Sequence, residues 1–356
     1  MTAPYQTQSL CIDEVTAPNR WNDLVHHFWQ QTWEYGEIQE KNNRIVRRYT
    51  IYTPDNKKLL GYFQLVVYPG IGTQAIGYIP HGPNVDVDQW EDHMGPELQS
   101  ALICIGRDLS CMYVRVEPQA ELGIYNKRII GLGIPIPRFA YRSSFNQPRG
   151  EAVTNLEFDE ETLVKQLSKS TKRNIAKAKK NNLTCSFYYG TDMLGYCDEF
   201  IALNTTNTES HGTTTHTDTY FHTLFSTLSQ HSDNFIARVL YEGEVCAINI
   251  FTVWGTEHNT YSFCPFGASN DTGKKLGAYY FVKWCSLVEM KQTIGSFNWG
   301  GVSLGYNDDN LRGVTTFKQG FESTSLDLGP LHDVVIQPLP YYSYLVYSYI
   351  KSFLKK

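Results

Sequence analysis

Residues 167–182 read LSKSTKRNIAKAKKNN, and the fold can be worked out starting from this basic segment. Seven Lys and Arg side chains fall within residues 165–180, although the whole chain has a net charge of −5. Wound at roughly 100° per residue, residues 163–180 form an amphipathic helix with an apolar face and a basic face. Alternatively, the segment divides into two helices, and the second is capped by one of the hydroxyl residues Ser168, Ser170 and Thr171. Such a charge run is either a solvated helix face or a site for phosphate groups.

The composition of the whole chain is that of a folded, soluble protein. Its 356 residues are enough for two domains of about 150 residues each. Apolar residues make up 42% and charged residues 19%, which excludes a disordered chain. No stretch approaches the roughly 18 apolar residues of a membrane span, and residues 1–18 lack the pattern of a signal peptide. We therefore expect a cytoplasmic monomer.

The cysteine and histidine residues do not form a metal-binding pattern. The eight cysteines are scattered and include no Cys-x-x-Cys pair, which argues against a zinc ribbon and a disulfide scaffold. Among the ten histidines, His211 and His216 share a polar loop, but no acidic third ligand stands at a suitable spacing. The sequence therefore predicts no metal site.

The apolar pattern repeats one order of elements in the two halves of the chain. The first half predicts a helix, three antiparallel strands, a helix and a strand, at residues 22–35, 44–53, 59–67, 73–79, 89–110 and 112–117. A strand at 153–158 and the basic segment follow. The second half then predicts a strand, two helices, three strands, a helix and a strand, at residues 183–189, 192–207, 220–230, 235–241, 244–254, 258–266, 276–291 and 296–299. The fold class is therefore α+β (mixed α/β).

Six short motifs lie along the chain in a fixed order. They are QTWEYG (31–36), YIPHGP (78–83), VRVEP (114–118), RNIAKA (173–178), FNWGG (297–301) and TFKQGF (316–321). In this order the chain resembles the FemABX family, the non-ribosomal peptidyltransferases that build peptidoglycan cross-bridges. The resemblance implies two tandem GNAT-like acyltransferase domains without the coiled-coil arm that some members carry. It places the first domain at residues 1–150 plus 331–356 and the second at 151–330.

The resemblance also implies an activity, the transfer of an amino acid from aminoacyl-tRNA to the amine of a peptidoglycan precursor stem peptide. The precursor is UDP-linked or lipid-linked, and the aminoacyl-tRNA is a co-substrate, so no further cofactor is implied. The implied catalytic residues are Lys318, which stabilises the tetrahedral intermediate, and Tyr261 in the substrate cleft. The implied substrate-binding residues are Phe317, Gly300, Gly301, Tyr78, His81 and Gln39. The basic segment supplies Lys172, Arg173 and Lys177 for phosphate groups of the tRNA.

Several positions depart from the family pattern. Gln39 stands where the family usually has a lysine, His81 stands where it has an arginine, and the loop at 208–212 lacks a further arginine. Arg173 and Lys177 are therefore the cations that we expect nearest to the phosphate-rich partner. The acids nearest to the Lys318 motif either orient that lysine or cap a loop; these are Asp308 and Asp309.

Two other functions stay open. One is an acyl-CoA-dependent N-acyltransferase that acts on a cell-envelope sugar or peptide amine, for which residues 271–278 (DTGKKLGA) come nearest to a pyrophosphate-binding turn. The other is a non-catalytic member that binds the precursor. Residues 340–356 are aromatic, apolar and basic at their end. They either pack on the first domain or rest on a membrane surface as a peripheral contact.

Overall fold

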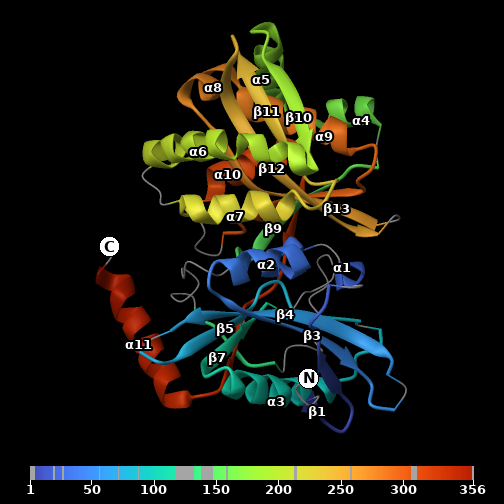
Figure 1. Ribbon diagram of the computed structural model, residues 1–356, viewed down its shortest axis with the longest axis vertical. Helices are drawn as coiled ribbons and strands as arrows, with labels where there is room; N and C mark the ends of the chain where they lie inside the picture. Colours follow the sequence, from blue (N-terminus) through green and yellow to red (C-terminus); the bar gives the residue numbers. More distant parts are fainter. Residues whose placement is uncertain are drawn as a thin grey trace.

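The computed structural model contains two β-sheets, one above the other along the long axis of the molecule (Figure 1). Helices cover the faces of both sheets, so the mixed α and β class predicted from the sequence is confirmed. The structure describes residues 5–18, 21–25, 28–55, 57–70, 72–86, 88–117, 132–137, 147–157, 159–211, 215–256, 259–305 and 311–354. Asp308 and Asp309 lie outside these ranges.

The first sheet is built from the N-terminal part of the chain and one strand from near its end. In spatial order its strands are β1 (Tyr5–Gln6), β2 (Cys11–Glu14), β3 (Ile45–Tyr52), β4 (Leu59–Pro69), β5 (Ala75–Ile79), β7 (Cys111–Val116), β16 (His332–Val335) and β8 (Ile134–Pro135), with β6 (Asn84–Val85) beside β4. Strands β5 and β7 pair in parallel, and the other pairs are antiparallel. Helix α3 (Met94–Asp108) buries Leu98, Leu102 and Ile105 against this sheet. Strand β16 therefore belongs to a sheet whose other strands all precede residue 136.

The second sheet holds the remaining strands. In spatial order they are β10 (Thr184–Tyr189), β11 (Phe235–Tyr241), β12 (Glu244–Thr256), β13 (Asn259–Ser269), β14 (Ser296–Val302), β9 (Gly150–Asn155) and β15 (Thr324–Asp327). Here β13 and β14 form the parallel pair, and the other pairs are antiparallel. Each sheet thus contains one parallel pair within an otherwise antiparallel order.

The basic segment forms two helices, as its hydroxyl residues allowed. They are α4 (Glu160–Gln166) and α5 (Lys169–Lys180), and Ser168 caps the second by accepting a hydrogen bond from Thr171 N at 3.1 Å. Helix α5 buries Ile175 and Ala178 and packs against α9 (Ala278–Met290). The continuous helix at 163–180 is therefore wrong, and the two-helix alternative is right.

The helix predicted at 276–291 forms as α9, and a further short helix, which was not predicted, precedes it. A short helix α8 (Asp271–Leu276) ends at Gly277, whose φ of +80° is left-handed, and α9 follows directly. A Cβ atom at Gly277 would lie 2.7 Å from the carbonyl oxygen of Asn174 on α5. Glycine is required here by the turn and by the close approach of α5.

The helix predicted at 22–35 is wrong. This part of the chain forms α1 (Trp21–Leu24), the 3₁₀ turn η1 (Trp29–Gln31) and α2 (Trp33–Lys41). Two local bonds explain the break. Thr32 caps α2 by accepting from Tyr35 N, and the Trp21 indole donates to Gln31 O at 2.7 Å. The apolar periodicity of residues 22–35 does not reveal these helix ends, so it predicted one continuous helix.

Other elements are shifted from their predicted positions, or were not predicted at all. The helix predicted at 192–207 is the 3₁₀ turn η5 (Gly190–Tyr196) followed by α6 (Cys197–His211), and the helix predicted at 220–230 is α7 (Asp218–Leu228). Helices α10 (Arg312–Gln319) and α11 (Pro338–Leu354) and strands β1, β2, β6, β8, β15 and β16 were not predicted. None of the helices formed by the described residues combines the length and apolar character that a bilayer crossing requires.

The two sheets are joined through helices α2 and α7, which lie next to each other in the middle of the molecule (Figure 1). Lys41 on α2 donates to the Thr227 hydroxyl at 3.0 Å, and His231 forms an ion pair with Glu34 at 2.8 Å. One buried apolar cluster runs across this boundary and contains Trp29 from one side and Phe221 from the other. The two parts therefore share a core as well as polar contacts.

Candidate active site

A cavity of about 470 Å³ lies in the second sheet, where β13 and β14 separate. These strands pair in parallel only over residues 261–263 and 296–298, and the register between β14 and β9 shifts between Asn298 and Gly300. Side chains from α9 and α10 complete the wall. The lining includes the predicted site residues Gly300, Gly301, Phe317 and Lys318, together with Lys283 and Trp299. The volume lies in the range typical of small-molecule sites.

Two glycines keep the strand side of the cavity open. Gly300 has a φ of +71°, and a Cβ atom there would lie 3.0 Å from the Phe263 ring and 3.9 Å from the Lys318 ammonium nitrogen. A Cβ atom at Gly301 would collide with the ring of Pro148. Residues with side chains would therefore strain the backbone or fill the space beside Lys318.

Lys318 presents its ammonium group at this wall from α10. Its Nζ atom donates to the carbonyl oxygen of Gly301 at 2.6 Å. Burial lowers the pKa of Lys318 to about 8, with Glu151 opposing the decrease and Lys283 adding to it. Lys318 is thus still mostly protonated at neutral pH, but held close to its titration point. A charged donor with part of its hydration removed is suited to stabilise an oxyanion.

A second lysine, Lys283, lines the same cavity from α9. Its side chain is only 4% exposed, and its Nζ atom lies 5.1 Å from the centroid of the Phe251 ring and 5.9 Å from that of Trp299. The Asn249 side-chain amide has one orientation in which both its nitrogen and its oxygen form hydrogen bonds. In this orientation Lys283 donates to the Asn249 amide oxygen at 3.2 Å. No carboxylate among the described residues lies within 4 Å of Lys283. The cavity therefore carries two cationic side chains.

Glu151, on β9, connects this wall to the first sheet. Its carboxylate accepts from the Asn298 amide at 2.7 Å, and Asn298 in turn accepts from Gly300 N at 2.7 Å. On its other side Glu151 forms an ion pair with His81 Nε2 at 3.2 Å. Burial works to raise the pKa of Glu151, but His81, the Asn298 hydrogen bond and the Lys318 charge together hold that pKa below the ordinary value. The position of Gly300 is thus fixed by a buried chain of polar contacts.

His81 lies in the turn after β5, between two carboxylates. Besides the contact with Glu151, its backbone N–H donates to Glu117 at 2.9 Å, and its ring stacks on Phe28 at 4.4 Å between centroids. Burial alone would lower the pKa of His81, but Glu151 and Glu117 together hold it above the ordinary value. Tyr78 completes the group by donating to Glu117 at 2.6 Å. Both predicted residues, Tyr78 and His81, are fully buried and paired with protein groups here.

Comparisons with known proteins bear on the family and the fold of the chain. A family model for the FemAB family matches residues 139–245, a range that includes α5 and its RNIAKA motif. The crystal structure of FemX is similar over 92% of this chain and 98% of its own, with a TM-score of 0.73 and 14% sequence identity. The chain thus matches a FemAB family model over part of its length and resembles FemX in fold.

Two further solved structures resemble this chain in fold. One is the C-terminal domain of a protein assigned as a lysylphosphatidylglycerol synthetase from Agrobacterium fabrum, with a TM-score of 0.55, 13% identity and coverage of 89% of this chain and 91% of that one. The other is a tandem GNAT protein from the clavulanic acid biosynthesis pathway, with a TM-score of 0.54, 8% identity and coverage of 90% and 99%. No curated protein matches the chain. The predicted GNAT-like fold is confirmed.

The remaining predicted site residues lie at different distances from the cavity. Phe317 lines it and packs on Tyr280, with ring centroids 4.9 Å apart. Tyr261 is on β13 two residues before the cavity wall, stacked on Trp254 at 6.1 Å, and is outside the described lining. Gln39 is buried on α2 and hydrogen-bonds Tyr220 of α7. The structure thus brings together Gly300, Gly301, Phe317 and Lys318, and joins His81 and Tyr78 to them through Glu151 and Glu117.

The predicted phosphate-binding residues lie on the solvent side of α5. Lys172, Arg173 and Lys177 are all exposed, and Lys172 donates to the Lys165 carbonyl at 2.9 Å. The start of α5 contacts the end of the helix that carries Lys318, because Ser168 N donates to Gly320 O at 3.0 Å. The basic face is therefore attached directly to the cavity wall, though its role in binding stays a prediction.

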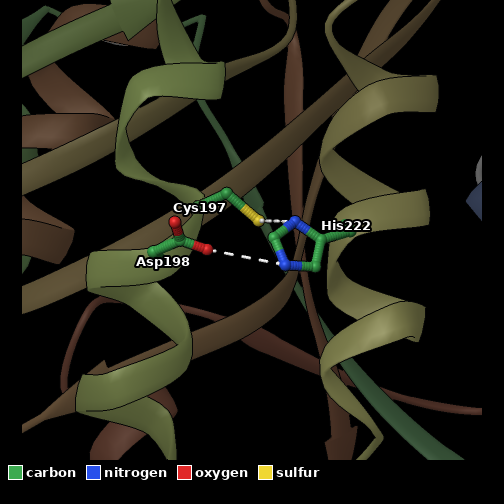
Figure 2. Close-up of side chains that lie close together, drawn as sticks. All are labelled: Cys197, Asp198 and His222. Carbon is green, nitrogen blue, oxygen red and sulfur yellow. Dashed lines mark hydrogen bonds and ion pairs between the residues drawn. The ribbon is translucent and has the colours of Figure 1, made fainter.

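Cys197, Asp198 and His222 form a group that could not be found from the sequence (Figure 2). The Cys197 thiol lies 3.4 Å from His222 Nδ1, and Asp198 lies 3.5 Å from His222 Nε2. All three are metal-ligand types, and one possible ligand atom of each lies within 4.8 Å of the others, although Cys197 and Asp198 lie nearest to different nitrogens of the His222 ring. Burial raises the pKa of Cys197 to about 11, which disfavours a thiolate. The predicted absence of a metal stays a prediction.

Lys283 and Glu151 are the site residues that sequence reasoning missed. Lys283 stands in the apolar helical run AYYFVKWCSLV, where a lone lysine gives a weak but usable signal of a buried cation. Glu151 stands in a short strand next to the polar residues 139–149, and nothing in its local pattern marks it. Its importance comes from contacts with residues far away in the sequence.

Proposed function

We propose that this protein transfers an amino acid from aminoacyl-tRNA to the amine of a peptidoglycan precursor stem peptide. The observation that carries the proposal is the Lys318 ammonium group, held at Gly301 O in the wall of a cavity between β13 and β14. The motifs that surround it are those on which the family resemblance rests. An ester carbonyl bound in this cavity would lie beside a partly desolvated cation.

The reaction needs no covalent enzyme intermediate. The acceptor amine attacks the ester carbonyl, a C–N bond forms, and the carbonyl oxygen becomes an oxyanion that accepts a hydrogen bond from Lys318. The C–O bond to the tRNA ribose then breaks, and the ribose oxygen takes up the proton that the amine releases. Stabilising the oxyanion lowers the barrier because the interaction is stronger in the transition state than with the neutral carbonyl.

The tRNA is held by charge in this proposal. The exposed face of α5 provides Lys172, Arg173 and Lys177, and the first turn of α5 is bonded to the end of α10 through Gly320. Phosphate contacts of this kind give affinity that falls as salt is raised. Tyr78 and His81 are buried, so their effect on a precursor passes through the chain of contacts to Glu151 and Gly300 rather than through direct contact.

An acyl-CoA-dependent N-acyltransferase is the second candidate, favoured by the tandem GNAT protein among the similar folds. A CoA pyrophosphate would need free backbone amides at the start of α8. The amide of Gly273 is already bonded to the Asn270 side chain at 2.8 Å, and α8 spans only residues 271–276. This occupied amide makes the site less suited to a pyrophosphate.

The two candidates are separated by one experiment. The protein is incubated with a mixed aminoacyl-tRNA pool and either a UDP-linked or a lipid-linked precursor, and the acceptor mass is measured. We expect a mass increase of one amino acid residue that depends on charged tRNA. A parallel reaction with acyl-CoA in place of tRNA should leave the acceptor unchanged. Transfer from acyl-CoA alone would establish the second candidate, and binding of precursor without transfer from either donor would establish a non-catalytic member.

A further inference from the structure

The C-terminal helix α11 is anchored to the first sheet by one face. Tyr341 is fully buried, its ring centroid lies 5.3 Å from that of Tyr113, and its hydroxyl donates to Asp333 at 3.1 Å. Tyr344 and Leu345 pack beside it. Since Tyr341, Tyr344 and Leu345 are three and four positions apart, they form one side of the helix. Figure 1 shows α11 at the side of the molecule beside the first sheet, and it contacts β7.

The opposite face of α11 is also apolar, and it is uncovered. Leu339, Tyr342, Val346 and Ile350 are 80%, 55%, 58% and 54% exposed. Their spacing of three, four and four residues places them in one stripe along the helix. Tyr347 and Tyr349 flank this stripe and are 55% and 48% exposed. We call these six residues the outer face of α11.

No comparable concentration occurs elsewhere in the described ranges. The outer face holds six of the twelve large apolar side chains that are exposed there. The other six are spread over as many separate elements and loops: Ile45, Ile134, Val164, Tyr189, Leu194 and Val314. Single exposed apolar residues are ordinary, whereas a continuous stripe usually marks a binding surface.

The charge around this stripe indicates what it binds. No acidic residue follows Asp333, and Lys351, Lys355 and Lys356 come directly after the stripe in the sequence. Tyrosine is enriched where a protein meets the boundary between water and hydrocarbon, because its ring is apolar and its hydroxyl is polar. Lysines beside such a helix are attracted to anionic lipid headgroups.

A second copy of the chain is a poorer occupant for the outer face. Its six half-exposed side chains offer roughly 600 Å² if aromatic and large aliphatic residues each present about 150–250 Å² in full. A stable dimer buries about 800 Å² on each partner. A lipid surface requires no such minimum, because binding grows with each side chain that enters the interface.

We propose that the outer face of α11 binds the surface of a lipid bilayer that contains anionic lipids. The inner face holds the helix in place on the first sheet, so the binding surface is formed before it meets the membrane. The apolar stripe enters the headgroup region, and the basic sequence that follows the stripe favours a membrane with anionic lipids. This goes beyond the proposed acyl transfer and does not depend on it, since it concerns a helix outside the cavity.

The test is sedimentation of the full-length protein with phosphatidylcholine vesicles, with and without phosphatidylglycerol. We expect binding to the vesicles that contain phosphatidylglycerol, weakened by added salt. The double variant Val346→Asp/Ile350→Asp should lower the bound fraction on the order of tenfold, because two carboxylates would have to enter the apolar region. Leu339→Asp, at the most exposed position, provides a second variant that leaves the inner face untouched.

The matched control is Ile45→Asp/Val164→Asp, which adds the same two charges at exposed apolar residues on β3 and α4. This control should bind vesicles like the parent, and the thermal unfolding of every variant is measured to establish that it is folded. Absence of parent binding to anionic vesicles, or equal loss in the control, would overturn the proposal. A parent dimer in sedimentation velocity that Leu339→Asp converts to monomer, without vesicle binding, would overturn it in favour of a second copy. Acyl transfer to a soluble acceptor should be unchanged in all these variants.

Discussion

Each of the two sheets contains one parallel strand pair. We call the first sheet the closed half, because side chains fill the space beside its pair, and the second sheet the open half, because its pair separates and leaves a cavity. In the first sheet, β5 pairs with β7 along its whole length, and the space after the pair is filled by Tyr78, His81 and Glu117. In the second sheet, the β13–β14 pairing stops after three residues, and the separation leaves the cavity with Lys318. Similar topology therefore provides a rigid support in one half and a binding space in the other.

The first sheet also includes β16, a strand from near the end of the sequence. Strand β16 pairs with β7, and Asp333 on β16 forms a bidentate contact with Arg115 on β7 at 2.8 and 3.0 Å, with both side chains fully buried. The open half has a similar pair, Arg149 and Asp327, at 2.6 and 2.8 Å, but its side chains are partly exposed. The two ion pairs differ mainly in burial. Breaking each pair therefore tests how far burial makes the first sheet depend on its ion pair more than the second.

The largest effect on stability is expected from Asp333→Asn in the closed half. This change leaves the buried Arg115 without a counter-charge, which should cost about 3–5 kcal/mol of unfolding free energy. Asp327→Asn breaks the partly exposed pair and should cost at most about 1 kcal/mol. Urea unfolding of both variants measures the difference. Equal losses of unfolding free energy in the two variants would mean that burial does not make the Arg115–Asp333 pair more important for stability than the Arg149–Asp327 pair.

The largest effect on activity is expected from Lys318→Met in the open half. Removing the group that stabilises the oxyanion should lower the transfer rate by about 10²–10³-fold with little change in unfolding temperature. Lys275→Met, at an exposed lysine on α8, is the matched control and should stay within about twofold of the parent. Retention of most activity by Lys318→Met would remove this residue from the mechanism.

A smaller effect on stability and activity is expected from adding one methyl group to the cavity wall at Gly300. Gly300→Ala places a Cβ atom against Phe263 and forces alanine into a left-handed conformation, which should cost about 1–2 kcal/mol of stability. Gly313→Ala is the control, because Gly313 lines the same cavity but a Cβ atom there would meet nothing within 4 Å. If both variants have the same stability and transfer rate, Gly300 does not keep the cavity open.

The smallest effect is on the pH dependence of transfer. Lys318 acts when protonated, so the rate should fall as the pH rises through about 8, the pKa of this lysine. Lys283→Met removes a nearby positive charge and should move this decrease to higher pH, whereas Glu151→Gln removes a negative charge and should move it to lower pH. Each displacement should be less than about one pH unit. Displacements in the same direction would contradict the charge arrangement of the cavity.

The sequence predicted the strands around both parallel pairs, because their apolar runs and short turns are local signals. The family resemblance named Gly300, Gly301, Phe317 and Lys318 as site residues, and the structure lines one cavity with all four, while their roles stay predictions. The sequence did not predict β16, whose four residues become a strand only by joining β7 and β8. Glu151 and Lys283 were missed for a related reason, because their roles are set by residues far away in the sequence.

The position of β16 has a consequence for biosynthesis. The chain builds most of the first sheet, then the whole second sheet, and only then adds residues 332–335 between β7 and β8. During synthesis, the first sheet therefore lacks its strand between β7 and β8 until the second sheet has been made. During that interval the edge of β7 and the apolar residues beneath α11 are open to solvent or to a chaperone. A strand that is synthesised after the whole second sheet thus completes the sheet that was begun first.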